Sequence, residues 1–159
     1  MTSQRSLPPP DFAQRSLPTE SVPAGASWVR IHGAGKGPLW FGPAPGGPPS
    51  GRFDDPQGEY RLCYLGLSLE AAFAEVFLRD VPVRLLPRQA LHERALSRVV
   101  ARESVRLVRF HGAGLAQLGA TAEVAYGSHD LSRPWGRVCW EHPDKPDGLL
   151  YRARHDDDQ

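Results

Sequence analysis

The stretch from residue 51 to residue 75, GRFDDPQGEYRLCYLGLSLEAAFAE, constrains the fold of this chain more than any other. It begins as a turn-rich loop, continues as an apolar run typical of a strand, and ends with helical periodicity. A loop–strand–helix path can bring its loop and its helix to one end of a small sheet. We therefore expect Arg52, Tyr64 and Glu75 to meet there, where an arginine, an aromatic ring and a carboxylate suit an anionic, ring-bearing ligand.

The helix at the end of this stretch is expected to span about residues 69–78, with Ser68 as its cap. Apolar side chains at helical spacing predict a buried stripe made of Leu69, Ala72, Phe73 and Val76. Glu75 falls beside this stripe, and a carboxylate at the rim of a buried face can look into a cleft. The alternative is an exposed ion pair with Arg79, one helical turn further on.

Other segments predict a single α+β domain, with a mixed sheet flanked by short helices. Strands are expected at 28–32, 60–66, 96–101, 104–110 and 148–152, and helices at 113–118 and 132–141, the second capped by Ser132. In the first strand, Val29 and Ile31 are expected to point inward. Arg30 then projects from the polar face or into a cleft.

The N-terminal residues 1–26 are predicted to form a disordered, proline-rich tail, and residues 27–159 the folded domain. The tail has few large apolar side chains, so its removal is expected to leave the melting temperature nearly unchanged. The GAGKG sequence that follows, at 33–37, lacks the spacing of both the Walker loop and the dinucleotide fingerprint.

Charge and composition argue against several classes of protein. The formal net charge of +1 does not suit a chain that mainly neutralises nucleic-acid phosphates. The chain lacks an apolar run near twenty residues and a signal-peptide pattern, so we expect neither a membrane span nor secretion. The two cysteines, Cys63 and Cys139, fit a reducing cytosol. Cys139 and His142 have a ligand-like spacing without a second half-site, so no metal is expected.

Each candidate residue also has a purely structural interpretation. In this interpretation Arg30 is a solvated strand residue, and Arg52 is a solvated turn residue. Tyr64 is explained as a core tyrosine with a satisfied hydroxyl. From the local pattern alone the structural interpretation is preferred, and only the combination of motifs favours a ligand site.

The combination of motifs resembles the RES domain, a toxin family of bacterial toxin–antitoxin systems. The motifs are WVRIH, GRFDDP, YLGLSLEAAFAEV, VRLVRFHGAGLAQLG, SRPWGRVCWEH and DGLLYRARHD, in this order along the chain. The most specific feature is GRFD followed by YLGLS and AAFAEV. The other motifs are weak when taken singly.

The resemblance implies a fold similar to ADP-ribosyltransferases of the diphtheria-toxin type, with NAD as substrate and no metal. Water, phosphate or a protein group would accept the ADP-ribose. Carried over by position, Arg30, Arg52 and Tyr64 bind NAD, and Glu75 acts with Arg52 in catalysis. The implied partner is a helix-turn-helix antitoxin that covers the site, and the implied location is the bacterial cytoplasm. The expected assembly is a homodimer or a toxin–antitoxin hetero-oligomer. Contact with a membrane or directly with nucleic acid is not expected.

One position departs from the family pattern. The serine expected within a tyrosine–x–serine–arginine pattern is replaced by Ala153, between Arg152 and Arg154. Three hypotheses follow: an NAD-cleaving toxin enzyme, a relative that binds NAD or an antitoxin without turnover, and an unrelated structural or nucleic-acid-binding module. The near-neutral charge disfavours the third.

Overall fold

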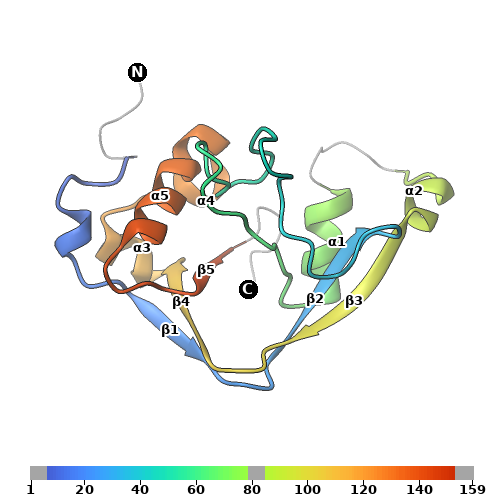
Figure 1. The fold of residues 1–159 in the computed structure, drawn as a ribbon, viewed down its shortest axis with the longest axis horizontal. Coiled ribbons are helices and arrows are strands. Elements are labelled where there is room, and N and C mark those ends of the chain that lie inside the picture. Colours follow the sequence, from blue (N-terminus) through green and yellow to red (C-terminus); the bar gives the residue numbers. More distant parts are fainter. Residues whose placement is uncertain (1–6, 79–84, 153–159) are drawn as a thin grey trace.

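The computed structural model describes residues 7–78 and 85–152, and a bent antiparallel ribbon runs through them (Figure 1). One half of the ribbon pairs β1 (Thr19–Val22) with β4 (Val105–Phe110). The other half pairs β2 (Ser27–Gly33) with β3 (Arg94–Val100). A fifth strand, β5 (Gly148–Tyr151), lies parallel to β4 and completes a three-stranded mixed sheet in the order β1-β4-β5.

The register of the ribbon does not change at its bend. Val22 faces Val105 on one side, and five positions further along each strand Ser27 faces Val100 on the other. Backbone hydrogen bonds of Ala101 with the 25–26 segment continue the ladder across the bend. The two sheets are therefore the two halves of one strand pairing.

Short helices complete the α+β fold that the sequence predicts. They are the 3₁₀ turn Phe12–Gln14, α1 (Leu69–Phe77), α2 (Arg88–His92), α3 (Ala113–Leu118), α4 (Glu123–Tyr126) and α5 (His129–Glu141). The predicted bounds of α3 are confirmed, and α1 ends within one residue of its prediction. The predicted cap is also present, since the Ser68 hydroxyl accepts the Ala71 N–H at 3.1 Å. Within the described ranges, no helix has the length and apolar character needed to cross a membrane.

The expected strand at 60–66 is wrong. Among the residues that the structure describes, this segment forms two isolated bridges, Leu62 with Gly42 and Gly66 with Val29, and no strand. The two bridges have different partners, one in the long loop and one in β2. No continuous ladder can therefore form along the segment.

The predicted start of α5 is also wrong, and so is the role of Ser132 as its cap. The helix begins three residues earlier, at His129, with Ser128 at the cap position. Ser132 lies one turn inside and is fully buried, and its hydroxyl donates to the Val124 carbonyl at 2.6 Å. Tertiary packing against α4 therefore explains this serine.

Two predictions about buried faces need correction. In α1 the buried residues are Ala71, Ala72 and Ala74, whereas Leu69 is exposed. Gly66 packs closely against this helix, since a Cβ on it would lie only 2.9 Å from the Ala72 nitrogen. This close approach calls for small side chains on the buried face of α1. In β2 the most buried residue is His32, on the face opposite Val29 and Ile31.

Residues 7–26 are folded, which corrects the prediction of a disordered tail. Phe12 is only 2% exposed, and its ring meets those of Trp135 and His142 edge-on, each at 5.7 Å. The backbone of β1 is paired with β4. A few apolar residues suffice because they complete a core built mainly by the rest of the chain. Residues 1–6 lie outside the described part.

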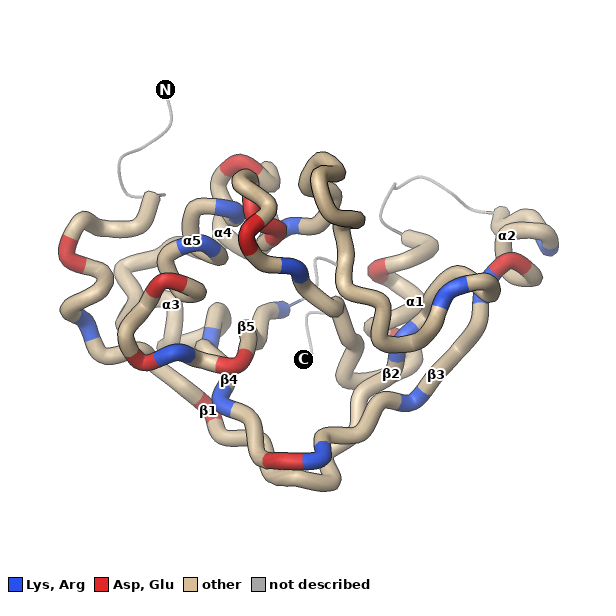
Figure 2. Tube along the Cα trace, viewed as in Figure 1, with Lys and Arg blue, Asp and Glu red and all other residues tan. Residues whose placement is uncertain are grey.

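The largest side chains of the core belong to the β1–β4 half of the ribbon. Its buried cluster includes Phe12, Phe53, Phe110, Trp135 and Cys139. Charged residues of both signs are interspersed along the chain outside this core (Figure 2). One core thus anchors the α5 helix and the loop that carries Phe53, next to Arg52.

Candidate functional site

Arg52 is held against the junction of α4 and α5. Its Nη1 donates to the Gly127 carbonyl at 2.7 Å and to the Ser132 hydroxyl at 3.2 Å. Since the Ser132 hydrogen goes to Val124, the hydroxyl oxygen is left to accept from Arg52. The guanidinium is therefore fixed by groups far away in the sequence.

The loop around Arg52 is closed by the buried carboxylate of Asp54. This carboxylate accepts the backbone N–H groups of Ser50 at 2.9 Å and Gly51 at 2.6 Å. It also accepts the Tyr64 hydroxyl at 2.9 Å. The same hydroxyl accepts the Phe53 N–H at 2.9 Å, so Tyr64 is bonded to both of the residues that follow Arg52. Gly51 permits this contact, since a Cβ there would lie 2.5 Å from the Tyr64 hydroxyl oxygen.

The environment of Tyr64 keeps its phenol neutral. Burial raises the pKa of Tyr64 far above its usual value, and the neighbouring charge of Asp54 acts in the same direction. The hydroxyl is thus a donor to Asp54, as the structural interpretation of this residue expects. Only its aromatic ring is left for any ligand.

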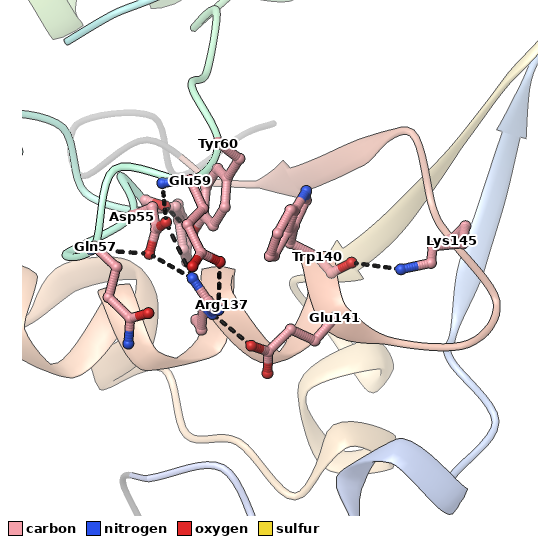
Figure 3. Close-up of polar contacts among 9 residues, drawn as sticks. Asp55, Gln57, Glu59, Tyr60, Arg137, Trp140, Glu141 and Lys145 are labelled. Atoms are coloured by element: carbon pink, nitrogen blue, oxygen red, sulfur yellow. Dashed lines mark hydrogen bonds and ion pairs between the residues drawn. The ribbon is translucent and has the colours of Figure 1, made fainter. Parts of the chain in front are cut away.

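A second carboxylate, Asp55, fixes the other side of the loop through Arg137 (Figure 3). The Asp55 side chain is fully buried and accepts the N–H groups of Glu59 at 2.6 Å and Gln57 at 3.2 Å. Burial by itself raises the pKa of Asp55, but these hydrogen bonds and Arg137 outweigh it, so the pKa lies below its usual value. Asp55 is therefore a charged anchor of the loop.

Arg137 also binds two exposed carboxylates and an aromatic ring. Its guanidinium lies 2.7 Å from Glu59 and 2.6 Å from Glu141, and 4.9 Å from the Trp140 ring centroid (Figure 3). One turn earlier in α5, Arg133 donates to the Pro49 carbonyl at 3.1 Å. Two arginines of α5 thus hold the loop on either side of Arg52.

Arg30 lies on β2 and reaches the segment that carries Tyr64. Its Nη1 donates to the Pro38 carbonyl at 2.8 Å and to the Cys63 sulfur. Burial raises the pKa of the Cys63 thiol, and Arg30 opposes this only in part. Through this contact Arg30 binds Cys63, the residue that precedes Tyr64 in the sequence.

Glu75 lies on α1 and is half-buried. Within residues 7–78 and 85–152 its side chain has no hydrogen-bond or ion-pair partner, and Arg79 lies outside those ranges. The structure thus joins Arg52 to Tyr64 through the 51–54 loop, and Arg30 to the same segment through Cys63. It provides no contact that joins Glu75 to the other three, and their meeting in one cleft stays a prediction.

Three residues of this region were missed by reasoning from the sequence: Asp54, Ser132 and Tyr151. The Tyr151 ring lies 5.0 Å from that of Phe53, whose N–H the Tyr64 hydroxyl accepts. The last motif of the chain therefore reaches the same region, although Ala153 itself lies outside the described residues. The paired aspartates of GRFDDP were the one available signal, because aspartate in a turn commonly accepts backbone N–H groups.

The spacing of Cys139 and His142 has a structural explanation. Burial raises the pKa of Cys139 to about 12. The His142 Nδ1 accepts the Asp144 N–H at 3.1 Å, so its Nε2 donates to the Arg15 carbonyl at 3.0 Å. Both residues serve the core and its contact with the N-terminal segment.

The fold and the site define a small α+β protein in which a fixed arginine lies on the same loop as a buried carboxylate that accepts a tyrosine hydroxyl. The chain belongs to the RES domain family, whose model matches residues 27–159. A similar protein is the "Probable toxin y4kH" of Sinorhizobium fredii (strain NBRC 101917 / NGR234), which is 29% identical over 65 residues. That match covers 40% of this chain and 51% of the relative, so it spans about half the relative's length. No solved structure matches the chain.

Proposed function

We propose that this protein is the toxin of a type II toxin–antitoxin system and cleaves NAD at the bond between nicotinamide and ribose. The observation that carries the proposal is Arg52, whose guanidinium is fixed by Gly127 and Ser132 while the next residue, Phe53, donates its N–H to the Tyr64 hydroxyl. Membership of the RES domain family supports it, and so does the name of the relative, a probable toxin. The proposed partner is a helix-turn-helix antitoxin.

The reaction places its main demand on a carboxylate. When the C1′–N bond of NAD breaks, its electron pair leaves with nicotinamide, and positive charge develops on the ribose as an oxocarbenium-like ion. A fixed carboxylate beside C1′ stabilises this charge, as in glycoside cleavage. In the proposal Glu75 has this role, and an oxygen of water, phosphate or a protein then bonds to C1′.

Binding of NAD calls for cations and an aromatic surface. A planar guanidinium donates two parallel hydrogen bonds to a phosphate, which suits Arg30 and Arg52 to the pyrophosphate. The ring of Tyr64 offers a face for nicotinamide. Its hydroxyl is engaged with Asp54, so in this proposal it takes no part in proton transfer.

The direct test is release of nicotinamide by the purified protein and its variants. Glu75→Gln is expected to abolish cleavage and leave NAD binding by calorimetry largely intact, because only the transition state carries the ribose charge. Glu70→Gln, on the same helix and exposed, is the matched control and should cleave NAD as the wild type does. Cleavage by Glu75→Gln at the wild-type rate would overturn the assignment of this residue.

Ala153 favours a second candidate function, a relative that binds NAD or an antitoxin without turnover. A serine at this position would supply one hydrogen bond to a charged group, worth about 1.5–3 kcal/mol. If that bond forms in the transition state, its loss lowers the rate roughly ten- to hundredfold. We expect slow NAD cleavage by the wild type and faster cleavage by Ala153→Ser. Binding of NAD with no nicotinamide release from either protein would favour the second candidate.

A further inference from the structure

The strand β3 forms an open edge of the molecule. Within the described ranges its backbone pairs with β2 alone, whereas β4 has a strand on both sides (Figure 1). The N–H and C=O groups that point away from β2 are therefore available to another strand. With seven residues, β3 is longer than the four-residue edge strands β1 and β5.

The side chains of β3 alternate regularly between exposed and half-buried. Arg94, Leu96, Arg98 and Val100 are the exposed set, with Leu96 at 59% and Val100 at 52%. Ile31 of β2 lies directly opposite Leu96, so apolar surface extends across both strands on this face. The edge thus offers two apolar and two cationic positions in strict alternation.

The charges on this edge select between possible occupants. The strand carries arginine and no acidic residue, as Figure 2 shows along β3. A second copy of the chain would bring a second β3 with the same two arginines. Pairing that aligned the apolar residues would then place arginines opposite or diagonal to each other, which is unfavourable. An acidic strand would meet no such repulsion.

We propose that the β3 edge is a docking strand for an extended segment of a partner protein in which acidic and apolar residues alternate. Main-chain hydrogen bonds to β3 would provide the affinity. The alternating contacts at Leu96 and Val100 and at Arg94 and Arg98 would fix register and specificity. This inference does not depend on NAD cleavage, because it uses none of the residues of the proposed site.

A pair of synthetic peptides tests the proposal on the full chain. The probe is a nine-residue peptide of alternating glutamate and valine, and its control has lysine in place of glutamate. Calorimetry should show binding of the glutamate peptide at least about tenfold tighter than of the lysine peptide. Hydrogen exchange should then show added protection of the β3 amides. Equal binding of both peptides, or no binding and no protection, would overturn the proposal.

Variants locate the binding on β3. Arg98→Glu should reverse the preference between the peptides, and Leu96→Thr should weaken binding while keeping a strand-forming residue. Arg61→Glu is the charge-matched control at an exposed arginine outside β3, and it should bind as the wild type does. Sedimentation distinguishes the other occupant: a dimer that Leu96→Thr dissociates, without peptide binding, would assign the edge to a second copy and overturn the proposal. Circular dichroism confirms that each variant is folded.

Discussion

The two halves of the ribbon share one register but differ in what covers them. The β1–β4 half is packed by large side chains, and Val108 and Phe110 of β4 are fully buried. The β2–β3 half contributes no residue to that cluster and has the alanine-rich α1 as its neighbour. Strand pairing alone therefore does not decide where a core forms. The location of the core is decided by the side chains that each half presents to its neighbours.

The candidate site draws on both halves. Arg52 is tied to α4 and α5 in the well-packed half, whereas Arg30 and Glu75 lie on β2 and α1 in the other half. The 51–66 segment joins them, since Phe53 is in the core and Gly66 is bridged to Val29. If NAD binds across both halves, its affinity depends on how firmly this segment holds them together.

The largest effect is expected from Phe12→Ala in the well-packed half. This change should lower the free energy of unfolding by about 3–5 kcal/mol, because it leaves a cavity against Trp135 and His142. Phe41→Ala, at a phenylalanine that is 45% exposed, is the matched control and should cost less than about 1 kcal/mol. Urea denaturation measures both. A loss from Phe12→Ala no larger than that from Phe41→Ala would mean that the packing of Phe12 adds little to stability.

A smaller effect is expected from Asp55→Asn, which weakens the contact of the loop with Arg137. Loss of hydrogen bonds to a charged group should lower the free energy of unfolding by about 1.5–3 kcal/mol at neutral pH. Glu141→Gln, at an exposed partner of the same arginine, should lower it by less than about 1 kcal/mol. A larger loss from Glu141→Gln than from Asp55→Asn would show that the exposed carboxylate contributes more to stability than the buried one.

The same carboxylate predicts a pH dependence. The pKa of Asp55 is lower in the folded protein than its ordinary value of 3.8, so the unfolded chain binds its proton more readily. This contribution is complete above the ordinary pKa and is lost as the pH falls toward the folded value. Urea denaturation between pH 6 and 3 should therefore show wild-type stability falling more steeply than that of Asp55→Asn. Parallel curves would show that Asp55 does not contribute in this way.

Local signals predicted the local structure of this chain, and contacts between distant segments were the part that they missed. The hydroxyl of Ser68 marked the start of α1 correctly, because a cap needs only its near neighbours. Ser132 looked like a cap by the same rule, yet its position depends on Val124 and Arg52. Phe12 likewise looked like part of a tail, since nothing near it in the sequence indicates its contact with Trp135.

The smallest effect on stability is expected from Ser132→Ala, which tests how the well-packed half holds Arg52. The variant leaves the Val124 carbonyl without its donor and removes one acceptor from Arg52, so we expect a loss of about 1 kcal/mol in stability. The Gly127 carbonyl still holds Arg52, and NAD binding should therefore weaken only a fewfold. Ser128→Ala is the control, because the Ser128 side chain makes no capping hydrogen bond. If binding by Ser132→Ala and Ser128→Ala is the same while the wild type binds NAD, Ser132 serves the fold alone. If the wild type does not bind NAD at all, the proposed function fails, and Ser132 is left as a buried link between α4, α5 and the Arg52 loop.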